Sequence, residues 1–196
     1  MRIIGGKYRG RRLYSMPKRK DTRLLRPTTD RVKESVFSIL DEYLEGTRFL
    51  DLFAGTGNVG IEAISRGVRE VVFVESDKRF CELIKKNLKS LGISPDKYRI
   101  ICDDFVKALK KLGRGSAKFD FIYADPPYEK GYYTKIVNLV KNLNLLDENG
   151  LLMLEEPKKN PFLPEGSRWI VERRHYGTTT LTFLNFSQPE AEDSNV

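Results

Sequence analysis

Residue types that build metal sites and disulfide frameworks are scarce in this sequence. Its 196 residues include one histidine and two cysteines, Cys81 and Cys102, which do not form a CxxC pair. A lone His175 leaves no metal cluster to propose, and isolated cysteines are typical of proteins from a reducing compartment. We therefore predict no metal site, two ordinary packed thiols and a cytoplasmic protein.

Long apolar runs are also missing. No stretch reaches the roughly 20 residues that a membrane-spanning helix needs, and the N-terminus lacks the apolar core of a secretion signal. Hydrophobic residues make up 40% of the chain and charged residues 32%, which is typical of a globular domain. We expect one main domain that has no membrane partner and acts as a monomer.

Acidic residues are rare near the start of the chain. The first 40 residues contain 12 Lys and Arg against 3 acids, so they carry +9, whereas the whole chain carries +8. Such a concentrated basic block favours a polyanion as partner, in the first instance nucleic acid. A solvated basic tail is the plainer alternative.

The pattern within residues 2–13 favours the nucleic-acid interpretation. A Gly-Gly turn separates two short β-like runs, which predicts a β-hairpin rather than a tail. Basic side chains neutralise phosphates and interleaved aromatic rings stack on unpaired bases, as in recognition of single-stranded or loop RNA. The candidate RNA-binding residues are Arg2, Lys7, Tyr8, Arg9, Arg11 and Arg12, followed by Arg26 and Arg31, for which a plain surface role is an equal alternative.

The chain divides into three segments. Residues 1–26 form the hairpin and a basic linker, residues 27–186 form the main domain, and the polar, acidic residues 187–196 are predicted to be disordered. In the main domain a first helix ends at Gly46. Strands are then predicted at 48–53, 70–75, 98–102, 119–124 and 150–155, alternating with helices from about 58, at 78–91, near 104–112 and near 132–143.

This alternation predicts an α/β fold with a parallel, doubly wound sheet. The ending differs, because residues 168–174 and 178–186 are two predicted strands with no helix between them. A hairpin at the end of a parallel sheet makes the last strand antiparallel.

A glycine-rich loop follows the first predicted strand. Gly55, Gly57 and Gly60 satisfy the GxGxxG pattern, a weak signal on its own, and open a helix. Glu75 ends the second strand 20 residues past Gly55, where a carboxylate binds ribose hydroxyls. Up to this point a dinucleotide site and an S-adenosylmethionine site look alike.

Asp51, just before the loop, favours S-adenosylmethionine. A carboxylate there repels a pyrophosphate but attracts a cationic amino-acid tail or a sulfonium. Asp104, or its neighbour Asp103, ends the third strand and is expected to accept from the adenine amino group. The candidate cofactor-binding residues are Asp51, Phe53, Ala54, Gly55, Thr56, Gly57, Glu75, Ser76, Asp104, Phe105 and Asp125.

The candidate catalytic residues are Asp125, Pro126, Pro127 and Tyr128, which end an apolar run of strand character. Neither proline donates a hydrogen bond and both fix φ, so the chain leaves the sheet in a stiff, extended turn. The Asp125 carboxylate, the Pro126 carbonyl and the Tyr128 ring then stand at the carboxyl edge, where open α/β sheets bind ligands. This set suits a planar base that carries an amino group.

Together these segments resemble a known family. The glycine loop and the antiparallel ending resemble the class I (Rossmann-like) S-adenosylmethionine-dependent methyltransferase fold. Asp125–Tyr128 resembles the (Asp/Asn)-Pro-Pro-(Tyr/Phe) motif of enzymes that methylate exocyclic amino groups. From Met1 to about Phe186, residues 2–13, 26–34, 50–67, 72–75 and 125–128 resemble the RsmD family of bacterial small-subunit (16S) ribosomal RNA guanine-N2 methyltransferases.

The resemblance implies a seven-stranded, mostly parallel sheet, S-adenosyl-L-methionine as cofactor, and an assembling small ribosomal subunit as partner. The motif itself does not select the base, so an adenine-N6 or cytosine-N4 methyltransferase is the runner-up, and methylation of a protein glutamine amide is a second. An NAD-dependent oxidoreductase needs a hydride-handling site, for which the chain offers only His175. A non-catalytic RNA-binding module leaves Asp51, Glu75 and Asp125–Tyr128 without a role.

Overall fold

The computed structural model describes residues 1–16, 30–127, 131–159, 162 and 168–187. Its helices are α1 (Asp30–Leu40), α2 (Asn58–Ser65), α3 (Lys78–Ser90), α4 (Phe105–Arg114) and α5 (Tyr132–Asn142), with short 3-10 helices η1 (Asp41–Tyr43) and η2 (Pro95–Lys97). Its strands are β1 (Arg48–Leu52), β2 (Glu70–Glu75), β3 (Tyr98–Cys102), β4 (Phe119–Ala124), β5 (Leu146–Pro157), β6 (Ile170–Tyr176) and β7 (Thr179–Leu184).

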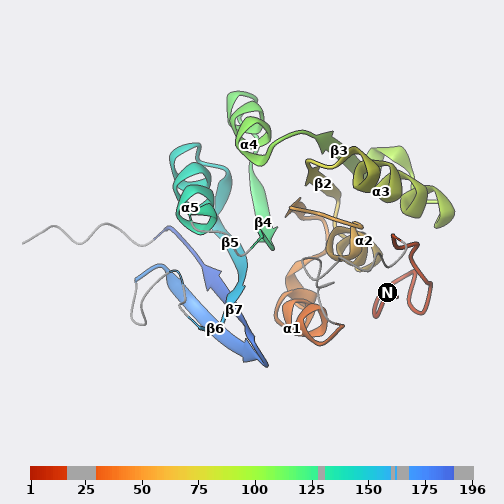
Figure 1. Cartoon of the computed structure of the whole chain (residues 1–196), viewed down its shortest axis with the longest axis horizontal. Coiled ribbons are helices and arrows are strands. Elements are labelled where there is room, and N and C mark those ends of the chain that lie inside the picture. Colours follow the sequence, from red (N-terminus) through yellow and green to blue (C-terminus); the bar gives the residue numbers. More distant parts are fainter. Residues whose placement is uncertain (17–29, 128–130, 160–161, 163–167, 188–196) are drawn as a thin grey trace, which may run out of the picture.

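The seven strands form one sheet in the order β3-β2-β1-β4-β5-β7-β6 (Figure 1). The first five are parallel, and β7 runs antiparallel between β5 and β6. The sequence prediction of a doubly wound sheet with an antiparallel last strand is therefore confirmed. The chain order reverses beside β1, so the carboxyl ends of β1 and β4 flank the crevice in which such sheets bind ligands.

Two helical layers cover the sheet. Alternate strand residues, such as Phe49, Phe73 and Tyr123, pack with α1, α2 and α3 on one face. Their neighbours along the strands, such as Leu50 and Ile122, pack with α4 and α5 on the other face. The near-continuous apolar strands are explained by this burial on both faces, since crossover helices cover each side of a parallel sheet.

The N-terminal segment lies against α2. A single antiparallel bridge joins Arg2 and Arg12, and the Ile3 N–H donates to the Arg11 carbonyl at 3.0 Å, so the predicted hairpin forms in a short version with a wide turn. Gly6 has φ of +68°, and a Cβ there would lie 1.8 Å from the Ser65 carbonyl oxygen. Only glycine therefore allows this close approach to the end of α2.

A buried carboxylate also fixes this contact between the N-terminal segment and α2. Glu62 of α2 accepts from the Ile4 N–H at 2.9 Å and the Gly5 N–H at 2.7 Å. The Lys33 ammonium of α1 lies 3.0 Å from Glu62, and both side chains are fully buried. Because an unpaired buried charge is costly, this pair holds α1, α2 and the N-terminal segment together.

Some predicted features lie outside the described residues. They are the basic linker at 17–26, including Arg26, the residue Tyr128 and most of the acidic tail. For Arg31 the structure describes the helix but not the side chain. Within the described ranges, no helix has the length and apolar character needed to cross a membrane.

Candidate functional site

Three carboxyl groups gather where neighbouring parallel strands end. Asp51 of β1 pairs in register with Tyr123 of β4, which pairs with Met153 of β5, so these residues share one face of the sheet. Asp125 and Glu155 follow two residues after Tyr123 and Met153. Glu155 accepts from the Tyr123 hydroxyl at 2.5 Å in a buried contact. Sequence reasoning missed Glu155, because its place beside Asp125 depends on strand register.

Burial controls the protonation of this cluster. It raises the pKa of the Asp125 carboxyl to about 8, and the charges of Glu155 and then Asp51 add to the rise. Burial also raises the pKa of Asp51 to about 7, although the Gly60 N–H donates to it at 2.8 Å and opposes the rise. For Glu155 burial raises the pKa while the bond from Tyr123 lowers it. Removal of carboxylates from water is the common cause.

The glycine loop passes directly beside these acids. Gly57 has φ of 77° and precedes the first residue of α2, and a Cβ there would lie 3.2 Å from Ile84. The Gly57 N–H donates to the Ala54 carbonyl at 2.7 Å, and Phe53 adopts a left-handed φ of 68°. These contacts give a tight turn whose backbone is open to close approach by a ligand.

Glu75 ties this loop to the next strand end. Its carboxylate accepts from the Gly55 N–H at 2.8 Å and from the Asp77 N–H at 2.9 Å. Ser76 follows it and is near enough for a weak hydroxyl contact at 3.5 Å. The carboxylate predicted to bind ribose is thus held beside the glycine loop, and its role in binding stays a prediction.

The two acids after β3 have different partners. Asp104 caps α4 by accepting from the Val106 N–H at 2.9 Å, and Asp103 accepts from the Asp104 N–H at 2.8 Å. Both side chains are exposed. The rings of Phe53 and Phe105 lie 5.0 Å apart and each also contacts Tyr132, so an aromatic cluster stands between the loop and α4. Either acid remains a candidate for the adenine contact.

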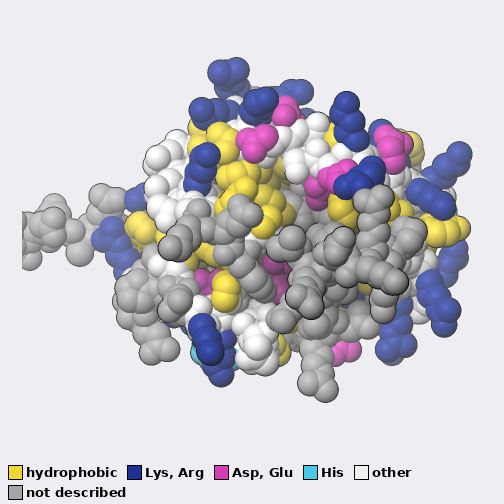
Figure 2. Space-filling model, in the orientation of Figure 1, with side chains coloured by type: hydrophobic (Ala, Val, Ile, Leu, Met, Phe, Trp, Pro, Cys, Tyr) yellow, Lys and Arg dark blue, Asp and Glu magenta, His cyan; other side chains and the backbone are white. Residues whose placement is uncertain are grey.

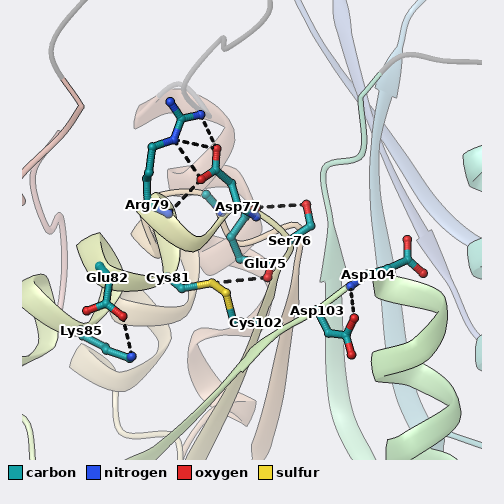
Figure 3. Close-up of a disulfide and its surroundings, with 11 residues drawn as sticks. Glu75, Ser76, Asp77, Arg79, Cys81, Glu82, Lys85, Cys102, Asp103 and Asp104 are labelled. Carbon is teal, nitrogen blue, oxygen red and sulfur yellow. Dashed lines mark hydrogen bonds and ion pairs between the residues drawn. A yellow bond between two sulfur atoms is a disulfide. The ribbon is translucent and has the colours of Figure 1, made fainter.

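The cysteines differ from the prediction of two packed thiols. Cys81, in the first turn of α3, forms a disulfide with Cys102 at the end of β3 (Figure 3). The Cys81 sulfur also lies 3.4 Å from the Glu75 carbonyl oxygen. The prediction was wrong because the two positions are 21 residues apart in sequence and meet only through the packing of α3 beside β3. The cysteine argument for a reducing compartment therefore no longer applies.

The predicted RNA-binding side chains of the N-terminal segment face solvent, apart from half-buried Tyr8. Arg2, Lys7, Arg9, Arg11 and Arg12 are all exposed. Figure 2 shows Lys and Arg side chains along the right-hand edge of the molecule, where Figure 1 places this segment and α3. The charges therefore form a surface continuous with the domain.

One contact from α3 extends that surface. The Lys86 ammonium lies 4.0 Å from the centre of the exposed Tyr14 ring, and Arg11 donates to the Ser90 carbonyl at 3.3 Å. The basic side chains of α3 and of the N-terminal segment thus belong to one face. Tyr14 is one of the aromatic residues that lie among the basic residues in the sequence, whereas Lys86 was not singled out.

Comparison with known proteins places these features in a family. The family described as conserved hypothetical protein 95 matches residues 1–185. Ribosomal RNA small subunit methyltransferase D of Haemophilus influenzae is 35% identical over 174 residues, 88% of each chain. The protein of the same name from Escherichia coli is 31% identical over 173 residues, 88% of this chain and 83% of that one.

A solved structure supports the same relationship. A hypothetical protein of Thermus thermophilus superposes with a TM-score of 0.79 and 32% identity. The match covers 95% of this chain and 99% of that one.

Proposed function

The chain belongs to the RsmD family, and on that premise we propose that it methylates the exocyclic N2 amino group of a guanine in small-subunit (16S) ribosomal RNA. The names of the relatives support the substrate class and the reaction. The guanine-N2 position is supported by the family resemblance alone. The Asp125-Pro126-Pro127 turn offers acceptors to an exocyclic amino group and does not select the base. S-Adenosylmethionine is the proposed methyl donor.

The observation that carries this proposal is the carboxyl cluster. The pKa values of Asp51 and Asp125 are raised by burial and by other acids, and no described cation lowers either of them. Such a site favours a cationic ligand, because a positive charge would stabilise the ionised carboxylates. S-Adenosylmethionine fits this set with both an ammonium and a sulfonium.

The proposed methyl transfer uses the residues that follow the end of β4. S-Adenosylmethionine, when bound, supplies an electrophilic methyl group on a sulfonium. Asp125 and the Pro126 carbonyl accept the two amino hydrogens of guanine, which favours a pyramidal nitrogen whose lone pair is aimed at the methyl. Holding the guanine nitrogen in line with the sulfonium would supply much of the rate enhancement. The Asp125 carboxylate would stabilise the positive charge that develops on that nitrogen.

The remaining roles concern the proton and the base. A carboxyl whose pKa lies near neutrality is suited to accept the proton that the methylated nitrogen loses. Asp125 is the residue of the cluster that adjoins the Pro-Pro turn. We propose that the ring of Tyr128 stacks on the guanine after it leaves its own stack.

The test is methyl transfer from labelled S-adenosylmethionine to three separate acceptors: small-subunit ribosomal RNA, small-subunit particles and DNA. Nucleoside digestion identifies the product. We expect N2-methylguanosine in the ribosomal RNA, and a comparison of the first two acceptors shows whether the substrate is naked RNA or an assembling particle.

The other outcomes contradict the proposal in different ways. Methyladenine or methylcytosine would retain the chemistry of Asp125 and overturn the choice of base. No transfer to any acceptor, with cofactor bound, would point to a protein or small-molecule acceptor. No cofactor binding would overturn the enzyme assignment itself.

A further inference from the structure

One buried polar atom at the start of α2 has no partner. Asn58 is 5% exposed, and its amide nitrogen Nδ2 is the one buried side-chain nitrogen or oxygen in the described part of the chain that makes no hydrogen bond. A buried donor without an acceptor destabilises a fold, so such atoms are rare and need an explanation. A ligand acceptor is one such explanation.

The neighbouring lysine fixes the direction of this amide. The Lys33 ammonium donates to Asn58 Oδ1 at 2.9 Å and to the Arg2 carbonyl at 2.6 Å, and it lies 3.0 Å from the Glu62 carboxylate. An ammonium has no acceptor capacity, so the amide oxygen must face it and Nδ2 must face away. Lys33 therefore acts as a positioning residue for Asn58.

The surroundings of Asn58 combine an acid with a helix N-terminus. Asn58 is the first residue of α2, and Gly57 before it provides no side-chain cap. Two residues further on, the Gly60 N–H donates to the Asp51 carboxylate at 2.8 Å. The first turn of α2 thus carries the free donor of Asn58 and holds the Asp51 carboxylate of β1 through the Gly60 N–H. The helix dipole favours an anion at that end.

This pairing matches an α-amino acid, whose carboxylate and ammonium are attached to one carbon. A pyrophosphate would also accept from Nδ2, but Asp51 would repel it. We propose that Asn58 Nδ2 binds the carboxylate of the methionyl part of S-adenosylmethionine, with Asp51 facing the ammonium. This assignment rests on the proposed function and adds a residue and a ligand group to it.

Ligands that differ by one group test the assignment by calorimetry, without turnover. The ligands are S-adenosylmethionine, its decarboxylated analogue and 5′-methylthioadenosine, which lacks the whole amino-acid tail. Asn58→Asp keeps an oxygen towards Lys33 but replaces the donor by an anion. We expect its affinity for S-adenosylmethionine to fall about 10- to 100-fold, as for loss of a charge-assisted hydrogen bond. The affinity for 5′-methylthioadenosine should stay within about twofold, and that for the decarboxylated analogue, which keeps its ammonium, should not fall.

Two further variants separate binding from folding. Asn58→Ala removes the donor without adding charge, and we expect the same selective loss on a smaller scale. Asn87→Asp is the matched control: Asn87 is fully buried on α3 and donates to the Thr56 carbonyl of the same loop at 3.1 Å, but all its polar atoms have partners. We expect it to change the three affinities by a common factor.

Each result has a definite meaning. An equal loss for S-adenosylmethionine and its decarboxylated analogue in both Asn58 variants, as in Asn87→Asp, would overturn the carboxylate assignment and leave the proposed function standing. A wild-type protein that binds none of the three ligands would overturn the proposed function, and the Asn58 assignment with it.

Discussion

At the scale of single residues, the site holds acids that oppose folding. Asp51 and Asp125 have pKa values raised to about 7 and about 8, so between about pH 4 and these values the folded protein keeps protons that the unfolded chain has released. Their contribution to the free energy of unfolding therefore has its full value below about pH 4 and decreases as the pH rises towards 8. A cationic ligand reverses the effect by stabilising the ionised carboxylates.

The same acids predict the pH dependence of the reaction. If ionised Asp125 accepts hydrogen bonds from the guanine amino group, kcat/KM for S-adenosylmethionine, which reports the ligand-free enzyme, should rise with pH around an apparent pKa near 8. The charge of Glu155 contributes to that value, so Glu155→Gln should shift the rise to lower pH. The pH profile of kcat/KM for wild type and variant measures the shift.

The next residue provides a matched control for this prediction. Glu156 lies on the opposite face of β5, where it accepts from the Phe162 N–H at 2.6 Å and from the Thr182 hydroxyl. Glu156→Gln makes the same chemical change without touching Asp125, so its profile should match wild type. A profile that is identical in all three proteins would argue against a coupling between Glu155 and Asp125.

At the scale of elements, the disulfide joins the pieces that surround Glu75. Cys81 lies four residues after the α3 N-cap Asp77, and Cys102 directly precedes Asp103. The bond therefore connects the helix that follows Glu75 with the strand end that carries the candidate adenine-binding acids. Cys81 is buried and Cys102 is exposed, so reductants reach the bond from one side.

Reduction of this bond should lower the thermal stability. By the chain-entropy model, a disulfide that closes a loop of about 20 residues contributes about 3 kcal/mol. For a domain of this size we expect a decrease in Tm of roughly 6 to 12 °C with dithiothreitol. The Cys81→Ser/Cys102→Ser protein should melt at the lower temperature and be insensitive to the reductant. Equal Tm values for oxidised and reduced wild type would contradict this prediction.

At the scale of the whole molecule, local patterns predicted the elements well. Strands such as Phe119–Ala124 are apolar runs, and the bounds of β1 to β4 agree with the sequence prediction to within one residue. The β5 strand was predicted at 150–155, but it starts four residues earlier, at Leu146, and ends at Pro157. The pattern of strands and loops placed Asp51, Glu75 and Asp125 at strand ends, and the structure shows them there. Their roles in binding and catalysis stay predictions.

Features that depend on distant parts of the chain were not predictable. The insertion of β7 between β5 and β6, the Cys81–Cys102 bond and the position of Glu155 all result from strand order and register. Lys33 shows the same limit, because a lysine in an amphipathic helix is expected at the surface, and only packing against Glu62 and Asn58 buries it.

The last prediction concerns the basic face that the N-terminal segment and α3 form together, where we expect one polyanion to contact both. Arg9, Arg11 and Arg12 are exposed, so changing all three to Gln should weaken RNA binding and reduce the slope of log K against log salt by roughly 2. The control changes three exposed lysines of α4, on the other side of the sheet, to Gln: Lys107, Lys110 and Lys111. This alters the net charge equally and should leave the slope nearly unchanged. Equal slopes for the two triple variants would mean that net charge alone, not this face, attracts RNA.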